Sequence, residues 1–230
     1  MLNGKNPSRI WELDFFRGIA ILLMVFFHFM YDLAAFYDVQ IHYEQGIIYY
    51  TGKAAACLFI FIAGISSSLS KNNLKRGVIL LFLGFVITLT TAVAVPGSNI
   101  VFGILHFLGV SILLYPLFKH IKPLILFFMA TLIILSGRYL SGINVPVNFL
   151  FPLGLVTEDF YSVDFYPLFP WFGLFLYGVA FSRWKYAAKQ SLFPFTLNNS
   201  LLVSAGQHSL IIYLIHQPVL LLLLYLFFHL

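Results

Sequence analysis

The sequence predicts an all-α protein, a polytopic bundle of transmembrane helices. Hydrophobic residues occupy 61% of the 230 positions and charged residues only 9%, whereas a soluble domain carries about 25% charge. Apolar runs long enough to cross a bilayer fill nearly the whole chain. No remaining stretch is long enough to build a separate aqueous core, so we expect a single membrane domain over residues 1–230.

Seven apolar runs of about 18 or more residues have the length that a membrane-spanning helix needs. They occupy residues 14–36, 47–69, 74–95, 100–118, 123–140, 166–183 and 208–229. We therefore expect about seven transmembrane helices. The longest non-spanning stretch, 141–165, is rich in Pro, Gly and Asn and is expected to form a lid or a re-entrant loop on the outer face.

The basic residues predict the orientation of the bundle. Of the thirteen Lys and Arg residues, most fall in the N-terminal segment and in alternate loops: Lys5, Arg9, Lys71, Lys75, Arg76, Lys119, Lys122, Arg183, Lys185 and Lys189. Short cytoplasmic loops carry an excess of Lys and Arg. This places the N-terminus in the cytoplasm and the C-terminus outside, and it explains the net charge of +5 without a nucleic-acid partner.

Two ionisable residues, Arg17 and His28, lie inside the first apolar run, and such residues mark functional sites in membranes. Eleven steps of 100° bring them within about 20° of one helix face, about 16 Å apart along the axis. Asp32 lies one turn beyond His28. A carboxylate at this spacing can orient an imidazole, so His28 and Asp32 are the predicted catalytic pair.

Further polar residues interrupt later spans: His106 in the fourth, and His216 followed by Gln217 in the seventh. The three imidazoles fall at comparable depth, which favours one shared cavity. Each histidine also has a simpler interpretation as a hydrogen bond between packed helices. No metal site is expected, because the chain has no HExxH motif and no Cys/His cluster.

The residues leave three functional classes open. The first is an enzyme with an intramembrane imidazole base. The second is a proton-coupled transporter in which His and Asp residues relay protons, although the chain has no visible internal repeat of the kind many transporters carry. The third is a scaffold whose histidines only pack, and it predicts no tight binding of a small molecule.

Four segments resemble a known family. The opening segment RIWELDFFRGIAILLMVFFHFMYDL is similar to the first helix of the integral-membrane acyltransferases (acyltransferase-3-like). FGILHFLGVSILLYP, FYPLFPWFGLFLYGVAF and GQHSLIIYLIHQPVL resemble later segments of the branch related to heparan-α-glucosaminide N-acetyltransferase. The resemblance implies transfer of an acyl group, most often acetyl, from cytoplasmic acyl-CoA to a hydroxyl or amine of a sugar or glycan across the membrane.

The resemblance also implies roles for individual residues. It implies that His28 is the catalytic imidazole and that Arg17 supports the donor end of the path. In the mechanism that we expect, Asp32 orients His28, and His106 or Tyr31 donates a hydrogen bond to the developing oxyanion. The remaining candidates are expected to bind substrates: Arg17, Lys75 and Arg76 the phosphates of acyl-CoA, with His216 and Gln217 completing the binding site.

In the lysosomal enzyme of that branch, the histidine assigned to catalysis lies after the first helix, in a segment closer to the loop containing His42. His42 is therefore the alternative base. Direct transfer and an acyl-histidine intermediate both remain open, as does a homodimer. The expected partners are acetyl-CoA or another acyl-CoA, the glycan acceptor and membrane lipid, and the expected location is the cytoplasmic membrane of a prokaryote.

Overall fold

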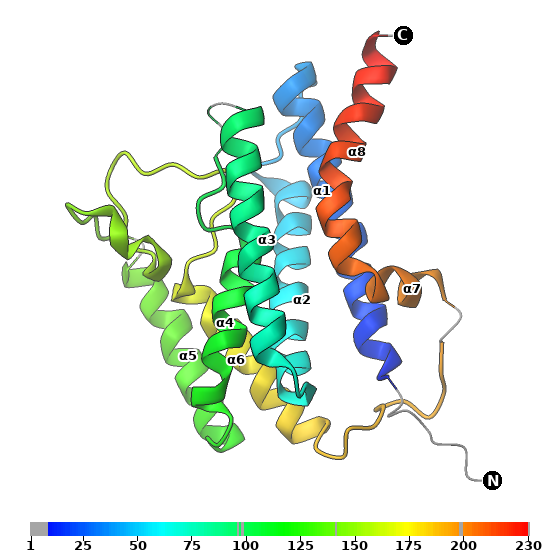
Figure 1. Ribbon diagram of the computed structural model, residues 1–230, viewed down its shortest axis with the longest axis vertical. Helices are drawn as coiled ribbons and strands as arrows, with labels where there is room; N and C mark the ends of the chain where they lie inside the picture. Colours follow the sequence, from blue (N-terminus) through cyan, green and yellow to red (C-terminus); the bar gives the residue numbers. More distant parts are fainter. Residues whose placement is uncertain (1–8, 96, 98, 141, 198–199, 230) are drawn as a thin grey trace. The chain divides into compact units, whose positions relative to one another are not determined.

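The computed structural model describes residues 9–95, 97, 99–140, 142–197 and 200–229 (Figure 1). Lys5, one of the basic residues used to predict orientation, lies outside them. The described residues form these helices in order: α1 (Trp11–Tyr37), α2 (Gly46–Leu69), α3 (Asn73–Ala94), α4 (Ile104–Phe118), α5 (Pro123–Leu140), the 3-10 helix η1 (Asn148–Leu153), α6 (Leu168–Lys185), α7 (Leu201–Gln207) and α8 (Ser209–His229). Apart from two isolated bridges, these ranges contain no strand, which confirms the all-α prediction.

Long helices occupy all seven predicted ranges, but they are not equally suited to span a bilayer. Within the described part of the chain, five are long and apolar enough: α1, α2, α3, α5 and α8. α4 has only 15 residues, because residues before Ile104 are extended and Phe102 pairs with Phe165 in a parallel bridge. α6 has 18 residues and carries Arg183 and Lys185 in its last turn. The structure also adds α7, which the apolar pattern did not predict.

The chain divides into two compact units, which we describe separately. The first contains residues up to Phe59 and from Lys189 onward, and the second contains Ile60–Ala188. α2 contributes its first part to one unit and its remainder to the other.

In the first unit, α8 runs alongside α1 in the same direction (Figure 1). Residue numbers rise together along their contacts: His28 with His216, Asp32 with Gln217, and Tyr37 with Phe228. A first and a seventh span must be parallel if the N-terminus and the C-terminus lie on opposite sides of a membrane. The packing agrees with that geometry, while the side on which the N-terminus lies stays a prediction.

Helix α7 packs on the first turns of α1 at backbone contact distance. A Cβ at Gly18 would lie 2.0 Å from the carbonyl oxygen of Leu202, and one at Gly206 would lie 1.7 Å from that of Asp14. Only glycine permits this approach, and small residues are typical of helix contacts in membranes. These two glycines therefore position α7, and the start of α8 that follows it, against α1.

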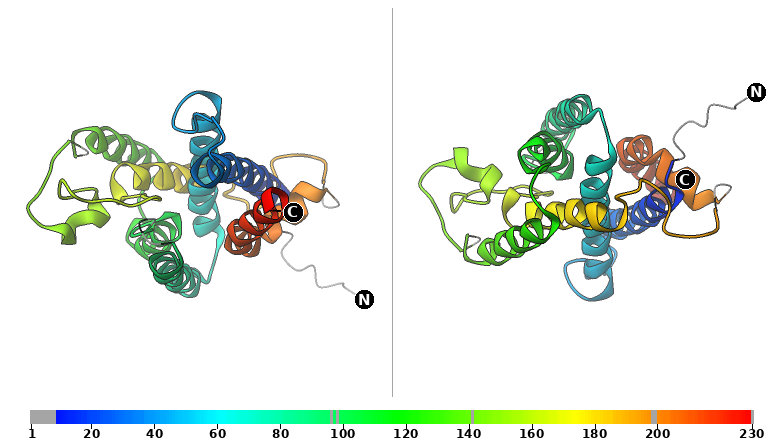
Figure 2. Two further views of the ribbon diagram at one scale, coloured as in Figure 1. Left: turned by 90° about the horizontal axis from the view of Figure 1, so that it is seen from above. Right: turned by 90° about the horizontal axis from the view of Figure 1, so that it is seen from below.

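The second unit contains two antiparallel helix pairs, α3 with α4 and α5 with α6 (Figure 2). Glycines again allow close approach, since a Cβ at Gly77 would lie 3.1 Å from the carbonyl oxygen of Gly109. Between α5 and α6, the hydroxyls of Thr131 and Tyr177 are hydrogen-bonded at 2.7 Å. In lipid, where apolar burial gives no advantage, such close contacts and polar bonds hold helices together.

The outward faces of several long helices expose large apolar side chains. Examples are Leu22 and Phe26 on α1, Phe82, Phe85 and Leu89 on α3, Phe128 and Leu132 on α5, and Leu222, Leu223 and Phe227 on α8. Contiguous apolar surface of this extent is unfavourable in water and is typical of helices surrounded by lipid. The protein is therefore an integral membrane protein.

Residues 142–165 fold back onto the start of α4. The Asp164 carboxylate accepts a hydrogen bond from the backbone N–H of Ile104 at 3.1 Å, and Ser162 accepts one from Val101 N–H. A carboxylate at a helix N-terminus satisfies a free N–H and interacts favourably with the helix dipole. This segment, expected to be a lid or re-entrant loop, is thus anchored to the second unit by its C-terminal end.

Candidate active site at the seam of α1 and α8

The predicted functional face of α1 points into the first unit. Ile21 and Met24 are buried there and form a cluster with Ala55 of α2. Further along the same face, His28 is half-buried and Asp32 is fully buried. Apolar packing thus fixes the helix directly before His28, which helps to preorganise a site there.

The His28 ring has a defined hydrogen-bonding state. Its Nδ1 lies 2.9 Å from the carbonyl oxygen of Met24, one turn earlier on α1. Because a carbonyl oxygen can only accept, Nδ1 must carry the proton. In the neutral ring, Nε2 then holds the lone pair, and no residue described in the structure is hydrogen-bonded to it. His28 therefore presents a base to its surroundings.

Asp32 does not form the predicted hydrogen bond with His28. Its Oδ1 instead accepts from Gln217 Nε2 of α8 at 2.5 Å. The expected hydrogen bond between His28 and Asp32 is wrong, because the Nδ1–H of His28 already donates to the Met24 carbonyl and the Asp32 carboxylate faces α8. A catalytic contribution of Asp32 stays a prediction.

The ring of His216, on α8, packs against the ring of His28. The two rings are 4.8 Å apart between centroids and inclined at 71°, in an edge-to-face arrangement. His216 Nδ1 lies 2.6 Å from the Tyr213 carbonyl oxygen, so this ring also carries its proton on Nδ1. Its Nε2 is buried without a hydrogen-bond partner among the described residues. The structure thus pairs two imidazoles whose Nε2 atoms are both acceptors when the rings are neutral.

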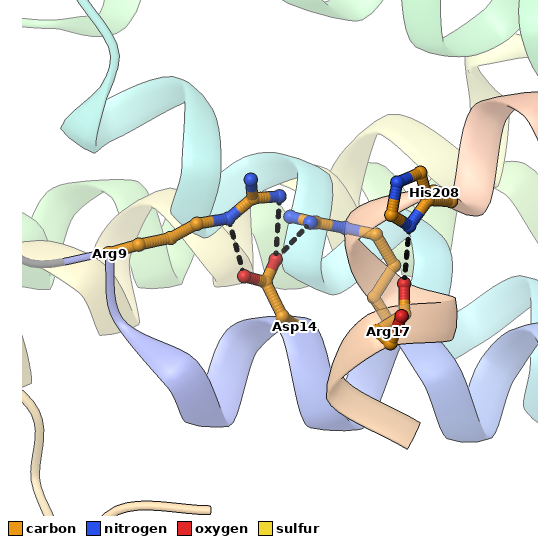
Figure 3. A network of polar contacts seen from close by, with 5 residues as sticks. Arg9, Asp14, Arg17 and His208 are labelled. Carbon is orange, nitrogen blue, oxygen red and sulfur yellow. Dashed lines mark hydrogen bonds and ion pairs between the residues drawn. The ribbon is translucent and has the colours of Figure 1, made fainter. Parts of the chain in front are cut away.

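Arg17, near the start of α1, belongs to an ion cluster (Figure 3). Its Nη1 donates to Asp14 Oδ1 at 2.7 Å, and Arg9 contacts both oxygens of the same carboxylate. Asp14 is 2% exposed. His208, drawn in the same view, bonds through Nδ1 to the Ser204 carbonyl instead. Two guanidinium groups on one carboxylate leave this three-residue cluster with a net positive charge.

The other predicted donor-binding residues lie in the second unit. Lys75 is exposed near the start of α3. Arg76 donates to Asn73 Oδ1 at 3.2 Å and to the Ser66 carbonyl at 3.5 Å, so it caps the C-terminal end of α2. Arg76 therefore has a structural role in the α2–α3 connection, and its proposed contact with phosphate stays a prediction.

His106 also belongs to the second unit, where it is 2% exposed. The rings of Phe85 and Phe102 enclose it, with centroids 5.1 and 5.8 Å from its own, and Gly84 lies against its edge. Neither ring nitrogen has a hydrogen-bond partner among the residues that the structure describes. The structure brings His28 and His216 together, whereas the expected convergence of His106 with them stays a prediction.

Two candidates lie near the C-terminal end of α1. Tyr31, one turn beyond His28, packs against Tyr43 with ring centroids 5.0 Å apart. His42, the alternative base, is exposed in the same connection between α1 and α2. Across the described residues, no group of three or more His, Cys, Asp or Glu side chains is placed to hold a metal ion.

Two acidic residues at the start of α1, Glu12 and Asp14, were not among the predicted site residues. Asp14 pairs with Arg17 at the (i, i+3) spacing that favours ion pairs on a helix, so its role was accessible from the sequence. Glu12 is fully buried and accepts a hydrogen bond from Leu192 N–H, 180 residues away. Only the fold shows that partner. Both carboxylates organise the helix end that carries Arg17.

The molecule is thus a polytopic membrane protein, a bundle of lipid-exposed helices. Its paired imidazoles, His28 and His216, form a candidate site for proton transfer. Residues 9–218 match the family model described as heparan-alpha-glucosaminide N-acetyltransferase, catalytic, and the chain belongs to that acetyltransferase family. The match confirms the resemblance to this branch. No curated protein and no solved structure is significantly similar to the chain.

Proposed function

We propose that this protein transfers an acetyl group from cytoplasmic acetyl-CoA to an amine or hydroxyl of a sugar or glycan at the opposite face of the membrane. The observation that carries the proposal is the match of residues 9–218 to the acetyltransferase family. The bundle of apolar helices supports an acceptor reached within or across a bilayer. We also propose that the chain is related to the wider acyltransferase-3-like group.

His28 acts as the general base in this proposal. Its fixed Nδ1–H leaves Nε2 to take a proton from the acceptor as the acceptor oxygen or nitrogen attacks the thioester carbon. The new C–O or C–N bond forms, the C–S bond breaks, and the proton passes from Nε2 to the departing sulfur to give CoA–SH. Tyr31, one turn away, or His106 is the proposed donor to the oxyanion formed in between.

Donor binding is assigned to the positive end of the same helix face. Arg17 lies eleven residues before His28, about 16 Å along the axis. The excess positive charge of the Arg9–Asp14–Arg17 cluster suits the phosphates of CoA. Lys75 and Arg76 are the proposed further contacts. The pantetheine arm would then lead the thioester inward from Arg17 toward His28.

A purified preparation in lipid nanodiscs tests the proposal. We expect transfer of radiolabelled acetyl groups from acetyl-CoA to at least one member of a panel of amino sugars and neutral sugars. The Arg17→Ala variant should need more acetyl-CoA for half-maximal rate. The matched control is Lys189→Ala, an exposed residue of the same unit. Absence of both acetyl-CoA binding and transfer would favour the proton-coupled transporter over the enzyme.

A further inference from the structure

Three acceptor atoms at the seam of α1 and α8 lack a partner. Asp32 Oδ2, His216 Nε2 and Gln217 Oε1 are buried, and none has a hydrogen-bond partner among the described residues. Asp32 is 0% and His216 9% exposed. Buried polar atoms are nearly always paired, and leaving one unpaired costs about 1–3 kcal/mol. Three in one cluster indicate that a group absent from the structure completes it.

These atoms belong to one cluster, because contacts connect the residues that carry them. Gln217 Nε2 donates to Asp32 Oδ1 at 2.5 Å, which leaves the amide oxygen of Gln217 outside this hydrogen bond. His216 precedes Gln217 on α8, and its ring lies 4.8 Å from that of His28. The cluster is therefore adjacent to the proposed base.

The chemistry of the cluster defines what it binds. All three atoms accept hydrogen bonds, so their partner must supply N–H or O–H donors. Asp32 has no cation within ion-pair distance in the described part of the chain, and a buried unpaired carboxylate is unfavourable. A protonated amine supplies three donors and the opposite charge, whereas a hydroxyl supplies one donor and no charge.

We propose that Asp32, His216 and Gln217 are the specificity-determining residues for the acceptor substrate, and that they hold its protonated amino group beside His28. The inference rests on the proposed function. His28 Nε2 first takes one proton from the ammonium and releases it to water, which regenerates the base before attack. The free amine then attacks the thioester carbon, the C–N bond forms and the C–S bond breaks, and the second proton leaves with the sulfur as CoA–SH.

Calorimetry on the protein in nanodiscs tests this inference without requiring catalysis. The probes are methyl glucosaminide, which carries the amine, and methyl glucoside, in which a hydroxyl replaces it. We expect the wild-type protein to bind the amine at least about tenfold more tightly. Asp32→Asn, which keeps the shape and removes the charge, should reduce that ratio to near one. Asp38→Asn, at the exposed end of α1, is the matched control and should preserve it.

A second variant keeps the inference testable if Asp32→Asn does not fold. Gln217→Leu removes both the unpartnered oxygen and the bond to Asp32, and it should lower affinity for the amine with little effect on the glucoside. Equal binding of both probes by the wild-type protein, or an unchanged ratio in both variants, would overturn the inference and leave the atoms to bound water. Amine-selective binding without acetyl transfer would instead retain the inference and contradict the proposed function.

Discussion

Gln217 donates from Nε2 to Asp32 Oδ1 at 2.5 Å, joining α8 to α1 across 185 positions of sequence. This bond directs the carboxylate toward α8 and leaves His28 to be oriented by the Met24 carbonyl. The polar residues of α1 therefore form two structural groups, one at Arg17 and one at the seam with α8. Each group gives predictions of its own.

Asp14→Asn should destabilise the protein strongly. Asp14 is 2% exposed and neutralises the half-buried Arg17, so the substitution leaves a cation without its counter-charge. Breaking a buried pair in this way costs about 3–5 kcal/mol. Unfolding in mixed micelles, followed by circular dichroism, measures the change. Arg9→Gln is the matched control, because that side chain is 59% exposed, and exposed ion pairs contribute about 0–1 kcal/mol. Similar losses in both variants would contradict this account of the cluster.

Gly206→Ala should loosen the contact of α7 with α1. The added Cβ would lie 1.7 Å from the Asp14 carbonyl oxygen, so the two backbones must separate. Overpacking of this kind costs about 1–3 kcal/mol or more. The same unfolding measurement applies. Gly142→Ala is the control, since the nearest atom to its Cβ would be 3.8 Å away. If the two variants are equally stable, the close contact is not a stabilising feature.

Glu12 should protect the backbone of the connection between α6 and α7. Its Oε1 accepts from Leu192 N–H at 2.8 Å, while Trp11 packs on Phe193 and Phe195. Glu12→Ala removes the acceptor, and loss of about 1–3 kcal/mol would speed amide exchange at Leu192 about ten- to hundredfold. Glu12→Gln retains an oxygen and should exchange more slowly than the alanine variant. Hydrogen-exchange mass spectrometry that finds Leu192 unprotected in the wild-type protein would contradict the contact.

The orientation predicted from basic residues is testable with single cysteines in a Cys57→Ala background. A cysteine at Glu158 should react with an impermeant reagent in intact cells, and one at Lys185 should not, because the positive-inside bias places these positions on opposite sides. Both residues are exposed in the structure. Labelling of the Lys185 position alone would reverse the topology.

Composition and periodicity were sufficient to predict the helices, because apolar runs of this length have few alternatives in a bilayer. They did not predict where α4 begins. The start of α4 depends on Asp164 and on the bridge of Phe102 with Phe165, and these contacts come from a distant segment. α7 was missed for a similar reason, since its place depends on backbone contact through Gly18 and Gly206.

The candidate site was partly accessible from sequence. Helical spacing predicted that His28 and Asp32 share one face of α1, and in the structure both residues contact α8. The same spacing also predicted a hydrogen bond between His28 and Asp32. This bond is absent because each residue has another partner, which helical spacing alone does not predict. The Met24 carbonyl takes His28, and Gln217 takes Asp32. The pairing of His28 with His216 required the parallel packing of α1 and α8.

The central claim is that the imidazole of His28 is the base for acetyl transfer. The most direct test compares initial rates of His28→Ala and His42→Ala at saturating acetyl-CoA and acceptor. We predict that His28→Ala lowers kcat by at least about a hundredfold, the lower end of what positioned proton transfer contributes, while acetyl-CoA still binds. His42→Ala should stay within about threefold of wild type, because that side chain is exposed in a loop. The reverse result, with His42→Ala inactive and His28→Ala close to wild type, would move the base to the loop and contradict the account.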